Sequence, residues 1–492
     1  MAKAKTVYIC QECGEEHLKW QGQCSACGEW NTLVEEVREV KTKGGLRAGR
    51  EISAADLTNK TINYAAVESA AEGQLRTSTG IGEFDRVLGG EADNQGMVAG
   101  AVMLIGGEPG IGKSTILTQV VIKQLEQLEQ KEQKERAGKR SGKNKSLGKI
   151  LYVAGEESPS QISLRINRIY DKEHKTKNSK DDSKQQLPAA VGEKLIFATS
   201  TDVDEVGAII AQQQPALVII DSIQTMTTQE LSGAPGSVGQ VRESTDRLTD
   251  AAKRFNIPTF LVGHVTKEGN IAGPKTLEHI VDAVLELSGE RTGQLRLLRA
   301  IKNRFGATDE VGVFKLDEVG LAEVTNPSEF FLEHADASVP GSATTCVMEG
   351  TRPLLMEVQA LVNESQLAMP RRVGRGIDVS RIQVLSAVLQ KHCRLPLGSH
   401  DIFLSAAGGY RVLEPGVDLG LAVALASSLN NKSLPKKTVF IGEIGLLGEI
   451  RAVSYLERRV KEAKRLGFAN VYSRATHQSV KQLLKDLDIL TK

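Results

Sequence analysis

Short apolar runs alternate with helix-forming stretches through the middle of the chain. The run at 102–105 precedes a glycine-rich turn and a helix-forming stretch at 116–127. Runs that are apolar throughout are typical of strands buried on both faces, and their alternation with helices predicts a mostly parallel sheet that binds ligands at the carboxyl ends of its strands. The other strands predicted in this part of the chain are 150–153, 195–197, 217–220, 259–262 and 295–300.

A second pattern begins near residue 338 and predicts a separate α/β domain. Its most regular elements are an amphipathic helix at 378–391 and an apolar helix at 415–428. The other elements expected there are a hairpin-like pair at 341–362, strands at 401–406 and 437–441, and a charged helix at 454–467.

These patterns predict an α/β protein in four parts. The expected limits are 1–39 for a cysteine-rich module, 40–76 for a polar linker, 77–325 for the strand–helix domain and 338–492 for the second α/β domain. A short helix within 77–90 should lead into the first strand. The polar stretches 123–149 and 171–186 are interpreted as solvated insertions, the first of them extending the helix before it.

Composition narrows the possible functions only slightly. With 492 residues the chain is too long for one core, and its 62 Lys and Arg balance 61 Asp and Glu. The net charge is therefore too small to attract nucleic acid to the whole protein, so any nucleic-acid binding has to use local patches of positive charge. No apolar run approaches the roughly 18 residues of a membrane span, and no signal peptide is recognisable, so we expect a cytoplasmic protein without a membrane partner.

The glycine-rich turn fits the pattern G-x-x-x-x-G-K-[ST]. Strand, turn and helix occur in the order that this motif needs, which favours a phosphate site over a chance turn. Backbone N–H groups would surround a polyphosphate at the helix N-terminus, with Lys113 at the β- and γ-phosphates and Ser114 on Mg²⁺. The residues predicted to bind ATP and Mg²⁺ are Gly107, Glu108, Pro109, Gly110, Ile111, Gly112, Lys113, Ser114 and Thr115.

Acidic residues at strand ends are candidates for the remainder of a hydrolysis site. Asp221 ends an apolar strand and could hold the Mg²⁺ shell through water. Of the adjacent Glu156 and Glu157, we choose Glu156 to orient or deprotonate the attacking water, although both could simply face solvent near a helix start. Ser158 and Gln161 form a plausible capping box. His264 could sense the γ-phosphate or be a structural histidine.

Basic residues supply two further hypotheses. Lys302 and Arg304 follow a strand one residue apart and could stabilise phosphoryl-transfer charge, within one chain or across a subunit boundary. Two long loops at strand ends, 224–239 and 267–276, could meet phosphates, and so could the basic loop 370–376. Scattered basic residues on loops, and an isolated Lys-x-Arg, are more often simply solvated, and for the loop 370–376 the two interpretations are about equally weighted. The candidate DNA contacts are Arg242, Lys267, Lys275, Arg371 and Arg372.

Two cysteine pairs near the start predict a structural zinc site. Each C-x-x-C pair can bring two sulfurs to one tetrahedral ion, and four thiolates leave no open position for catalysis. Zinc is favoured over disulfides or unmetallated thiols in a reducing compartment. Trp20 and Trp30 flank the second pair and are expected to supply the module's small apolar core rather than to stack on bases. The predicted ligands are Cys10, Cys13, Cys24 and Cys27.

These motifs, with the segments 106–115, 155–158, 263–269 and 302–306, make the chain resemble the RadA (Sms) family of bacterial DNA-repair proteins over nearly its whole length. Segment 302–306, K-N-R-F-G, is the family's most specific signature. The resemblance implies a RecA-like P-loop NTPase core with a four-cysteine zinc module and a domain like that of the Lon protease. It further implies a homo-hexameric ring on single-stranded DNA that drives branch migration or helicase action on branched recombination intermediates.

The same resemblance implies roles for single residues and partners. Glu156 would activate water, Asp221 would be the acid on the Mg²⁺ side, and Lys302 with Arg304 would reach a neighbouring subunit's nucleotide. The two long loops would line a DNA channel, and a RecA-type recombinase or a replicative helicase would be the protein partner. In the Lon-like domain the nucleophilic serine falls at Gly416 and the lysine at Glu457. Because both catalytic groups are missing, we expect a non-proteolytic scaffold.

Two alternatives to a DNA motor come from other functional classes. One is an ATP-dependent protease, which the missing serine and lysine disfavour. The other is a non-motor ATP switch on the same core, which the zinc module and the K-N-R-F-G segment disfavour.

Overall fold

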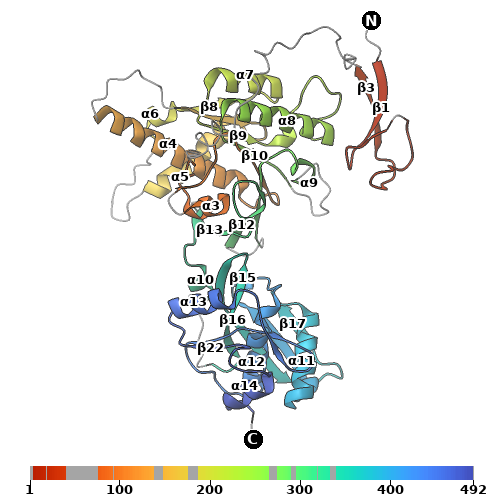
Figure 1. Ribbon diagram of the computed structural model, residues 1–492, viewed down its shortest axis with the longest axis vertical. Helices are drawn as coiled ribbons and strands as arrows, with labels where there is room; N and C mark the ends of the chain where they lie inside the picture. Colours follow the sequence, from red (N-terminus) through yellow and green to blue (C-terminus); the bar gives the residue numbers. More distant parts are fainter. Residues whose placement is uncertain are drawn as a thin grey trace, which may run out of the picture. The chain divides into compact units, whose positions relative to one another are not determined.

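The computed structural model describes ten stretches of the chain, namely residues 4–17, 19–39, 76–91, 94–137, 148–174, 187–264, 274–289, 295–318, 320–332 and 339–490. They form two compact units (Figure 1). The first comprises residues 1–289, 296–308 and 314–323, and the second comprises 290–295, 309–313 and 324–492. The domain limits drawn from the sequence stay predictions. No helix in the described stretches is long and apolar enough to cross a membrane.

The chain begins with a small antiparallel sheet, in the order β2-β1-β3. Its strands are β1 (Ala4–Cys10), β2 (Glu16–His17) and β3 (Leu33–Glu39). Cys10 and Cys24 are buried with Leu33, and Tyr8 packs against them. Trp20 and Trp30 are 57% and 67% exposed, so the prediction that they form the module's apolar core is wrong. The buried cysteines fill that place instead.

A large sheet forms the centre of the first unit, and its described part has nine strands in the order β14-β13-β12-β11-β6-β10-β9-β7-β8. The strands from β11 to β8 are parallel. They are β6 (Val102–Gly106), β7 (Ile150–Ala154), β8 (Leu195–Ala198), β9 (Leu217–Asp221), β10 (Thr259–Val262) and β11 (Ala283–Ser288). The five predicted strands from 102–105 to 259–262 are confirmed.

Helices cover both faces of this sheet, because alternate residues of each strand enter different cores. Met103 and Ile105 of β6 pack in one core with helices α3 (Gly82–Leu88), α4 (Lys113–Ala137) and α5 (Pro159–His174). Val102 and Leu104 pack in the other core with α7 (Val203–Gln213) and α8 (Val238–Phe255). The remaining short elements of the unit are β4 (Gly90–Glu91), β5 (Asn94–Gln95), α6 (Ala189–Gly192), η1 (Ile223–Thr225) and α9 (Pro274–Leu277).

The sheet continues beyond β11 with strands that leave the parallel pattern. β12 (Leu295–Asn303) runs antiparallel to β11, and β13 (Val311–Leu316) pairs antiparallel with β14 (Leu321–Glu323). The sequence reading placed 295–300 in the parallel alternation and did not anticipate β11, β13 or β14. The short connection from Ser288 to Leu295 explains the difference, since a parallel crossover needs a dozen or more residues.

The structure describes only part of each polar insertion. α4 continues to Ala137, so the first insertion does extend its helix, as the Gln-, Glu- and Lys-rich composition favours. Residues 138–147 of the first insertion and 175–186 of the second lie outside the described residues.

The second unit has a sheet in the order β17-β18-β16-β15-β19-β22. Its strands are β15 (Ser342–Glu349), β16 (Arg352–Glu364), β17 (Arg372–Arg375), β18 (His400–Ala406), β19 (Thr438–Phe440) and β22 (Asn470–Tyr472). Helices α11 (Val379–Cys393), α12 (Asp418–Leu429) and α14 (Val480–Asp486) share the main core with one face. Helix α13 (Leu456–Arg465) packs on the other face through a second, smaller cluster.

Smaller elements complete this unit. They are α10 (Pro327–Leu332), the 3₁₀ turns η2 (Leu397–Ser399), η3 (Ala407–Gly409) and η4 (Pro415–Val417), and a hairpin of β20 (Glu443–Ile444) and β21 (Ile450–Arg451). The predicted apolar helix at 415–428 thus begins with a 3₁₀ turn at Pro415 and becomes α-helical at Asp418. The helices predicted at 378–391 and 454–467 are confirmed.

A buried ion pair joins α13 to the sheet of the second unit. Arg459 is fully buried and pairs with Glu414, and it also donates to the carbonyl oxygens of Cys346 (2.5 Å) and Ser454 (3.0 Å). The other oxygen of Glu414 accepts the N–H of Met348 at 2.7 Å. Arg459 and Glu414 neutralise each other away from bulk water. Removal of either side chain leaves the charge of the other without its partner.

We predict that Arg459→Ala lowers the unfolding free energy of the second unit by about 3–5 kcal/mol, because Glu414 keeps its charge without a counter-ion. Hydrogen exchange measured by mass spectrometry on peptides of α12 and β15 checks this, since both tryptophans lie in the N-terminal module and do not report on this unit. The control is Arg458→Ala, which removes an exposed guanidinium over the Tyr455 ring. Equal exchange in both variants would contradict the prediction.

Candidate functional site

The glycine-rich turn lies between the end of β6 and the first residue of α4, where the sequence placed it. β6 ends at Gly106 and α4 begins at Lys113. A Cβ atom on Gly107 would lie 2.4 Å from the carbonyl oxygen of Leu287, and Gly112 has a φ of 116°. Neither position accepts a side chain without strain. The turn is therefore shaped to present backbone at the N-terminus of a helix, which is the geometry that binds phosphate.

Lys113 points back over this turn. Its Nζ donates to the carbonyl oxygens of Gly107 (2.9 Å) and Glu108 (3.1 Å) and lies 3.2 Å from Nδ1 of His264. The side chain is buried, and burial lowers the pKa of Lys113. Asp221 and Glu156 act in the opposite direction and favour its charged form. A cation is thus held over the turn by carbonyl groups that a polyphosphate could replace.

Asp221 ends β9 beside the turn. Its Oδ2 accepts a 2.7 Å hydrogen bond from the hydroxyl of Tyr152 on the neighbouring strand β7. Its Oδ1 is buried and has no hydrogen-bond partner among the described residues. Burial raises the pKa of Asp221, and the hydrogen bond from Tyr152 and the nearby Ser114 hydroxyl oppose this. A buried oxygen in need of a partner, close to the hydroxyl of the motif, fits a hydrated Mg²⁺ held between Asp221 and Ser114.

Glu156 follows β7 and faces His264, which follows β10. Nε2 of His264 lies 3.0 Å from Oε1 of Glu156, and Ser222 donates its hydroxyl to the same oxygen. The hydrogen bond from His264 lowers the pKa of Glu156 despite its partial burial. The backbone N–H of Glu156 also donates to the carbonyl of Asp221 at 3.1 Å. Glu156 is therefore an ionised carboxylate fixed beside the turn.

The capping box predicted after Glu157 is confirmed. The N–H of Ser158 donates to Gln161 at 3.0 Å, the N–H of Gln161 donates to the hydroxyl of Ser158 at 3.3 Å, and Pro159 is the first residue of α5. Glu157 pairs with Arg165 of the same helix. The two adjacent glutamates thus differ, since Glu156 faces the turn and Glu157 supports α5.

The sequence reading missed three residues of this site. They are Tyr152, Ser222 and Gln224, the last with both side-chain amide atoms buried and without a hydrogen-bond partner in the described stretches. A Cβ on Gly263, beside His264, would lie 3.7 Å from the amide nitrogen of Gln224. Their position one to three residues from a strand end is the only signal that the sequence offered.

Lys302 and Arg304 lie away from this site within one chain. Asn303 pairs with Ala283, which pairs with Met103 near the start of β6, whereas the glycine-rich turn follows the end of β6. At about 3.3 Å per residue, the length of β6 separates the two edges by roughly 15 Å. Lys302 donates to the carbonyls of Glu278 and Val281, and Arg304 pairs with Asp282 at 3.1 Å. Within one chain, both side chains are therefore held away from the glycine-rich turn.

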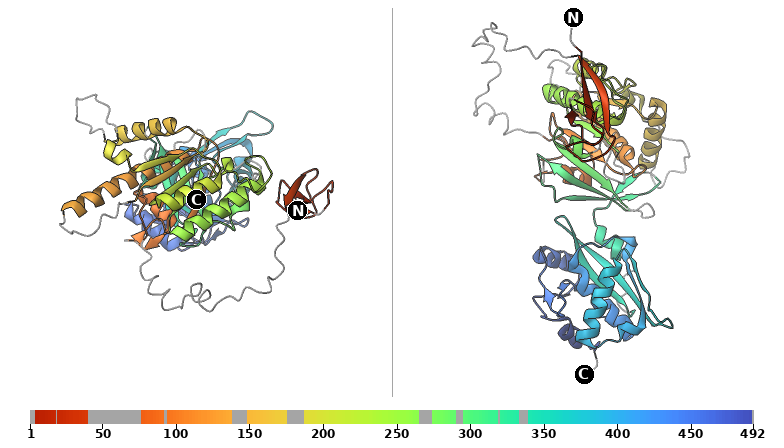
Figure 2. Two further views of the ribbon diagram at one scale, coloured as in Figure 1. Left: turned by 90° about the horizontal axis from the view of Figure 1, so that it is seen from above. Right: turned by 90° about the vertical axis from the view of Figure 1, so that its right-hand side faces the viewer.

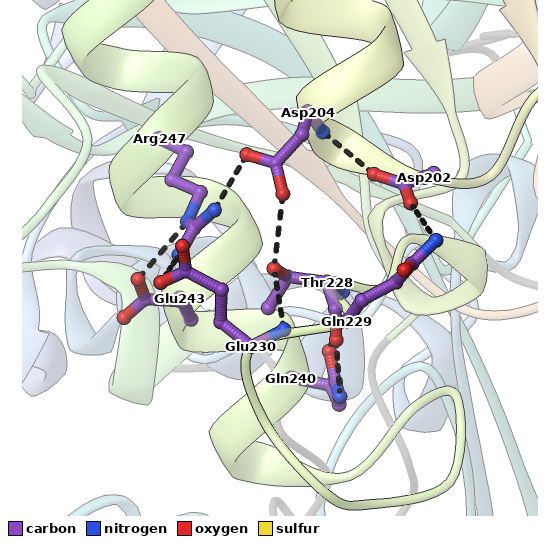
Figure 3. Close-up of polar contacts among 8 residues, drawn as sticks. All are labelled: Asp202, Asp204, Thr228, Gln229, Glu230, Gln240, Glu243 and Arg247. Carbon is purple, nitrogen blue, oxygen red and sulfur yellow. Dashed lines mark hydrogen bonds and ion pairs between the residues drawn. The ribbon is translucent and has the colours of Figure 1, made fainter. Parts of the chain in front are cut away.

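The loop after β9 is fixed at its base by a polar cluster (Figure 3). Arg247 of α8 pairs with Asp204 (2.5 Å), Glu230 (2.7 Å) and Glu243 (3.0 Å). Gln240 exchanges hydrogen bonds with the backbone of Thr228. These contacts fix the backbone at 228–231 against α7 and α8. Beyond these contacts, residues 232–235 of the predicted channel loop are exposed.

The candidate DNA contacts have different surroundings. Arg242 is exposed on α8, and Arg371 is exposed before β17. Arg372 donates to the carbonyls of Leu397 (2.8 Å), His400 (2.5 Å) and Arg371 (2.9 Å), so its guanidinium is occupied and Arg371 is the better candidate of the two. Lys267 lies outside the described residues, and for Lys275 only its backbone position in α9 is described.

The four cysteines converge on one point. Their sulfur atoms all lie within 4.8 Å of one another, with 3.6 Å between Cys10 and Cys27 and between Cys13 and Cys24. All four are free thiols, and Zn–S bonds of about 2.3 Å place the sulfurs of a tetrahedral site just under 4 Å apart. His17 donates to or accepts from Cys24 at 3.3 Å, and Thr32 contacts Cys10 at 3.2 Å. The donor set fits a structural zinc ion.

Comparisons with known proteins agree with these features. Residues 8–35 match the family described as "Rubredoxin metal binding domain", residues 94–270 match "AAA domain", and residues 363–473 match "Subunit ChlI of Mg-chelatase". Among solved structures, the KaiC-like protein PH0186 from Pyrococcus horikoshii is 17% identical and covers 51% of this chain and 98% of its own, with a TM-score of 0.35 that is too low to support an argument.

Full-length relatives match far more closely. "DNA repair protein RadA" of Pseudomonas aeruginosa is 46% identical over 468 residues, which cover 95% of this chain and 92% of the relative. The protein of the same name from Bacillus subtilis is 43% identical over the same coverage, and that of Brucella abortus is 42% identical over 95% of this chain and 91% of the relative.

We predict that Cys24→Ser lowers the zinc content from one ion per chain to none, since three thiolates hold the metal poorly. Both tryptophans lie in this module, so fluorescence anisotropy follows it alone and should fall as the module loses its order. The control is Cys393→Ser, at a buried cysteine of the second unit. One zinc retained per chain of Cys24→Ser would show that Cys24 is not a ligand.

We predict that Glu156→Gln slows ATP turnover about 10²–10⁴-fold, because a general base is lost, while ATP binding remains. Steady-state hydrolysis and binding of a fluorescent ATP analogue measure the two properties separately. The matched control is Glu157→Gln, which disturbs only the pair with Arg165. Slow turnover of Glu157→Gln together with normal turnover of Glu156→Gln would show that Glu157, and not Glu156, is the general base.

Proposed function

Because the chain belongs to the family of DNA repair protein RadA, we propose that it is a DNA-dependent ATPase that binds single-stranded DNA and drives branch migration or unwinding of recombination intermediates. That it is a P-loop ATPase of DNA repair follows from the family itself. The observation that supports ATP hydrolysis in this proposal is the convergence of Lys113, Glu156, Asp221 and His264 at one edge of the parallel sheet, against the glycine-rich turn. The part played by DNA rests on the family.

Each of these side chains has a chemical role in the proposal. Lys113 would release the carbonyls of the turn and bind the β- and γ-phosphates of ATP. Ser114 and Asp221 would hold Mg²⁺, which neutralises phosphate charge when it is bound. Glu156, kept ionised by His264, would orient the attacking water and take its proton. His264 contacts both Lys113 and Glu156, so it is placed to respond when the γ-phosphate leaves.

We further propose that Lys302 and Arg304 complete the site of a neighbouring subunit. They lie at the sheet edge opposite the glycine-rich turn, so a charge-stabilising role requires the nucleotide of a second chain. Such a contact is heterologous, and repeated head-to-tail contacts close into a ring. A homo-hexamer on single-stranded DNA is the assembly that we propose, with the stretch 232–235 and Arg242 facing the DNA. Lys267 and Lys275 stay candidate contacts. A RecA-type recombinase or replicative helicase is the proposed protein partner.

Proteolysis, the first alternative, is not supported by the second unit. Gly416 is buried and Glu457 is exposed, and a Cβ on Gly416 would lie 3.0 Å from Glu414 and 3.3 Å from Arg459. The buried ion pair thus fills the space beside Gly416 where a serine and lysine would have to meet. The second alternative, a nucleotide switch without motor activity, is separated from our proposal by the response to DNA.

We predict that single-stranded DNA stimulates steady-state ATP hydrolysis and that Lys302→Ala removes the stimulation, because the substitution takes away transition-state charge stabilisation. Hydrolysis with and without DNA, on the wild type and the variant, measures this. An ATP turnover that changes neither with DNA nor with the substitution would favour the nucleotide switch without motor activity.

A mixing experiment tests action across the subunit boundary. Lys113→Ala lacks the phosphate-binding cation, whereas Lys302→Ala has an intact glycine-rich turn. Neither variant alone should show DNA-stimulated turnover. Equal amounts of the two proteins should recover about a quarter of the DNA-stimulated turnover of the wild type, since that share of random boundaries combines an intact turn with an intact Lys302. No recovery in mixed rings would overturn the proposed role of Lys302.

A further inference from the structure

The K-N-R-F-G segment, residues 302–306, begins at the end of β12 and lies against the end of α3 in the first unit (Figure 1 and Figure 2). The side-chain amide of Asn303 donates to the carbonyl of Leu88 at 3.1 Å, and its oxygen accepts the N–H of Phe305 at 3.0 Å. Asn303 therefore fixes the turn that follows the strand and attaches this turn to the helix. The two cations of the segment project from a backbone whose position depends on α3.

The glycine of the segment has a packing reason. A Cβ atom on Gly306 would lie 3.2 Å from the Cα of Gly89, the residue that caps α3, and 3.2 Å from the carbonyl oxygen of Leu88. Gly89 has a φ of 84°, a conformation that disfavours a side chain there as well. The two backbones thus touch directly, so the segment keeps its place only while it stays against the end of the helix.

One guanidinium joins these two elements to the hairpin of β4 and β5. Arg76 precedes Thr77, whose N–H and carbonyl both bond to Met97 at 2.8 Å. The backbone N–H of Arg76 donates to the side chain of Asn94 at 3.1 Å. Its guanidinium donates to four carbonyl oxygens, those of Leu88 (3.2 Å), Gly89 (2.8 Å), Gly96 (3.1 Å) and Phe305.

These four carbonyls belong to different parts of the fold. Leu88 and Gly89 end α3 and Gly96 follows β5, whereas Phe305 belongs to the K-N-R-F-G segment. Nη1 donates to the first three and Nη2 donates to Phe305, so the rigid fork of one side chain connects the segment to the body of the unit. Helix α3 has other support, because its side chains pack in the core of the large sheet. Loss of Arg76 is therefore expected to free the segment and to leave the fold.

Arg76 lies away from the nucleotide site of its own chain. The carbonyls that it contacts precede the start of β6 or follow the end of β12, at the sheet edge opposite the glycine-rich turn. Any effect of Arg76 on ATP turnover therefore has to pass through the segment that it holds.

We propose that Arg76 is a positioning residue for the K-N-R-F-G segment and sets the reach of Lys302 and Arg304 toward the nucleotide of a neighbouring subunit. The inference rests on the proposed function, which assigns those two cations to the neighbouring site, and adds the residue of the same chain that makes them effective. Stabilisation of transition-state charge requires donors that are fixed before the reaction, so a loosened segment costs turnover and not ATP binding.

Subunit mixing tests on which side of the boundary Arg76 acts. Arg76→Ala alone should lose about 10²-fold in DNA-stimulated ATP turnover, the cost of a small misplacement, and should bind a fluorescent ATP analogue as the wild type does. An equal mixture with Lys113→Ala should recover about a quarter of the DNA-stimulated turnover of the wild type, because one protein supplies an intact turn and the other an intact segment. A mixture with Lys302→Ala should recover none, because both proteins then lack an effective segment.

Two results overturn the inference and leave the ATPase as proposed. They are recovery in the mixture with Lys302→Ala, and DNA-stimulated turnover of Arg76→Ala alone that equals the wild type. The parallel mixture of Lys113→Ala with Lys302→Ala separates these results from a failure of the proposed function. No recovery in that mixture overturns the role of the segment itself and the role of Arg76 with it.

A second variant distinguishes positioning from a need for Arg76 in folding. Arg76→Lys keeps a cation at the end of α3, where a positive charge is favourable, but its single nitrogen cannot replace the fork that spans the four carbonyls. It should bind the ATP analogue and give the same result as Arg76→Ala in both mixtures. Weak binding of the analogue by both variants, or full DNA-stimulated turnover of Arg76→Lys, overturns the inference.

The matched control is Arg86→Ala. Arg86 is an exposed arginine on α3 that pairs with Glu83 at 3.4 Å. Its loss should leave DNA-stimulated turnover within about twofold of the wild type, because an exposed ion pair contributes little. An equal loss of turnover in Arg86→Ala and Arg76→Ala would show a general effect of charge at α3 and overturn the specific role of Arg76.

Discussion

The parallel register of β6, β7, β9 and β10 is the constraint on which the candidate site depends. All four strands end at one edge of the sheet, so the residues that follow them are brought together although they are far apart in the sequence. The carbonyl of Asp221 accepts the N–H groups of Gly155 and Glu156, which fixes the spacing between the two carboxylates. A one-residue slip of any strand would move its polar side chain to the other face of the sheet.

The site is held together by a chain of polar contacts rather than by isolated groups. His264 lies between Lys113 and Glu156, Ser222 supports Glu156, and Tyr152 holds one oxygen of Asp221. The pKa shifts of these three groups have two physical causes, burial and hydrogen bonding. Burial destabilises the charged forms of Lys113 and Asp221, whereas hydrogen bonds keep Glu156 ionised. A carboxylate that stays charged beside a buried cation is suited to orient a water molecule by accepting its hydrogen bond.

The second unit is supported from within by one ion pair. Arg459 and Glu414 occupy the interior beside Gly416 and satisfy each other's charge and several backbone groups. Such a network is costly to break, which makes it a structural support and an obstacle to chemistry at the same place.

The sequence by itself determined much of this protein, because some signals are local. Glycine spacing specifies the phosphate turn, C-x-x-C spacing brings two sulfurs to one ion, and Ser158 with Gln161 specifies a helix start. Most buried strands were readable for the same reason. The direction of β12 could not be predicted from its own residues, since it depends on the short connection to β11. The exposure of Trp20 and Trp30 could not be predicted either, because it depends on which other side chains fill a very small core. Only the tertiary structure could decide that Glu156 meets His264 while Glu157 meets Arg165, and that Lys302 and Arg304 lie on the edge away from Lys113. Those outcomes follow from strand order and direction, which no single segment of the sequence contains.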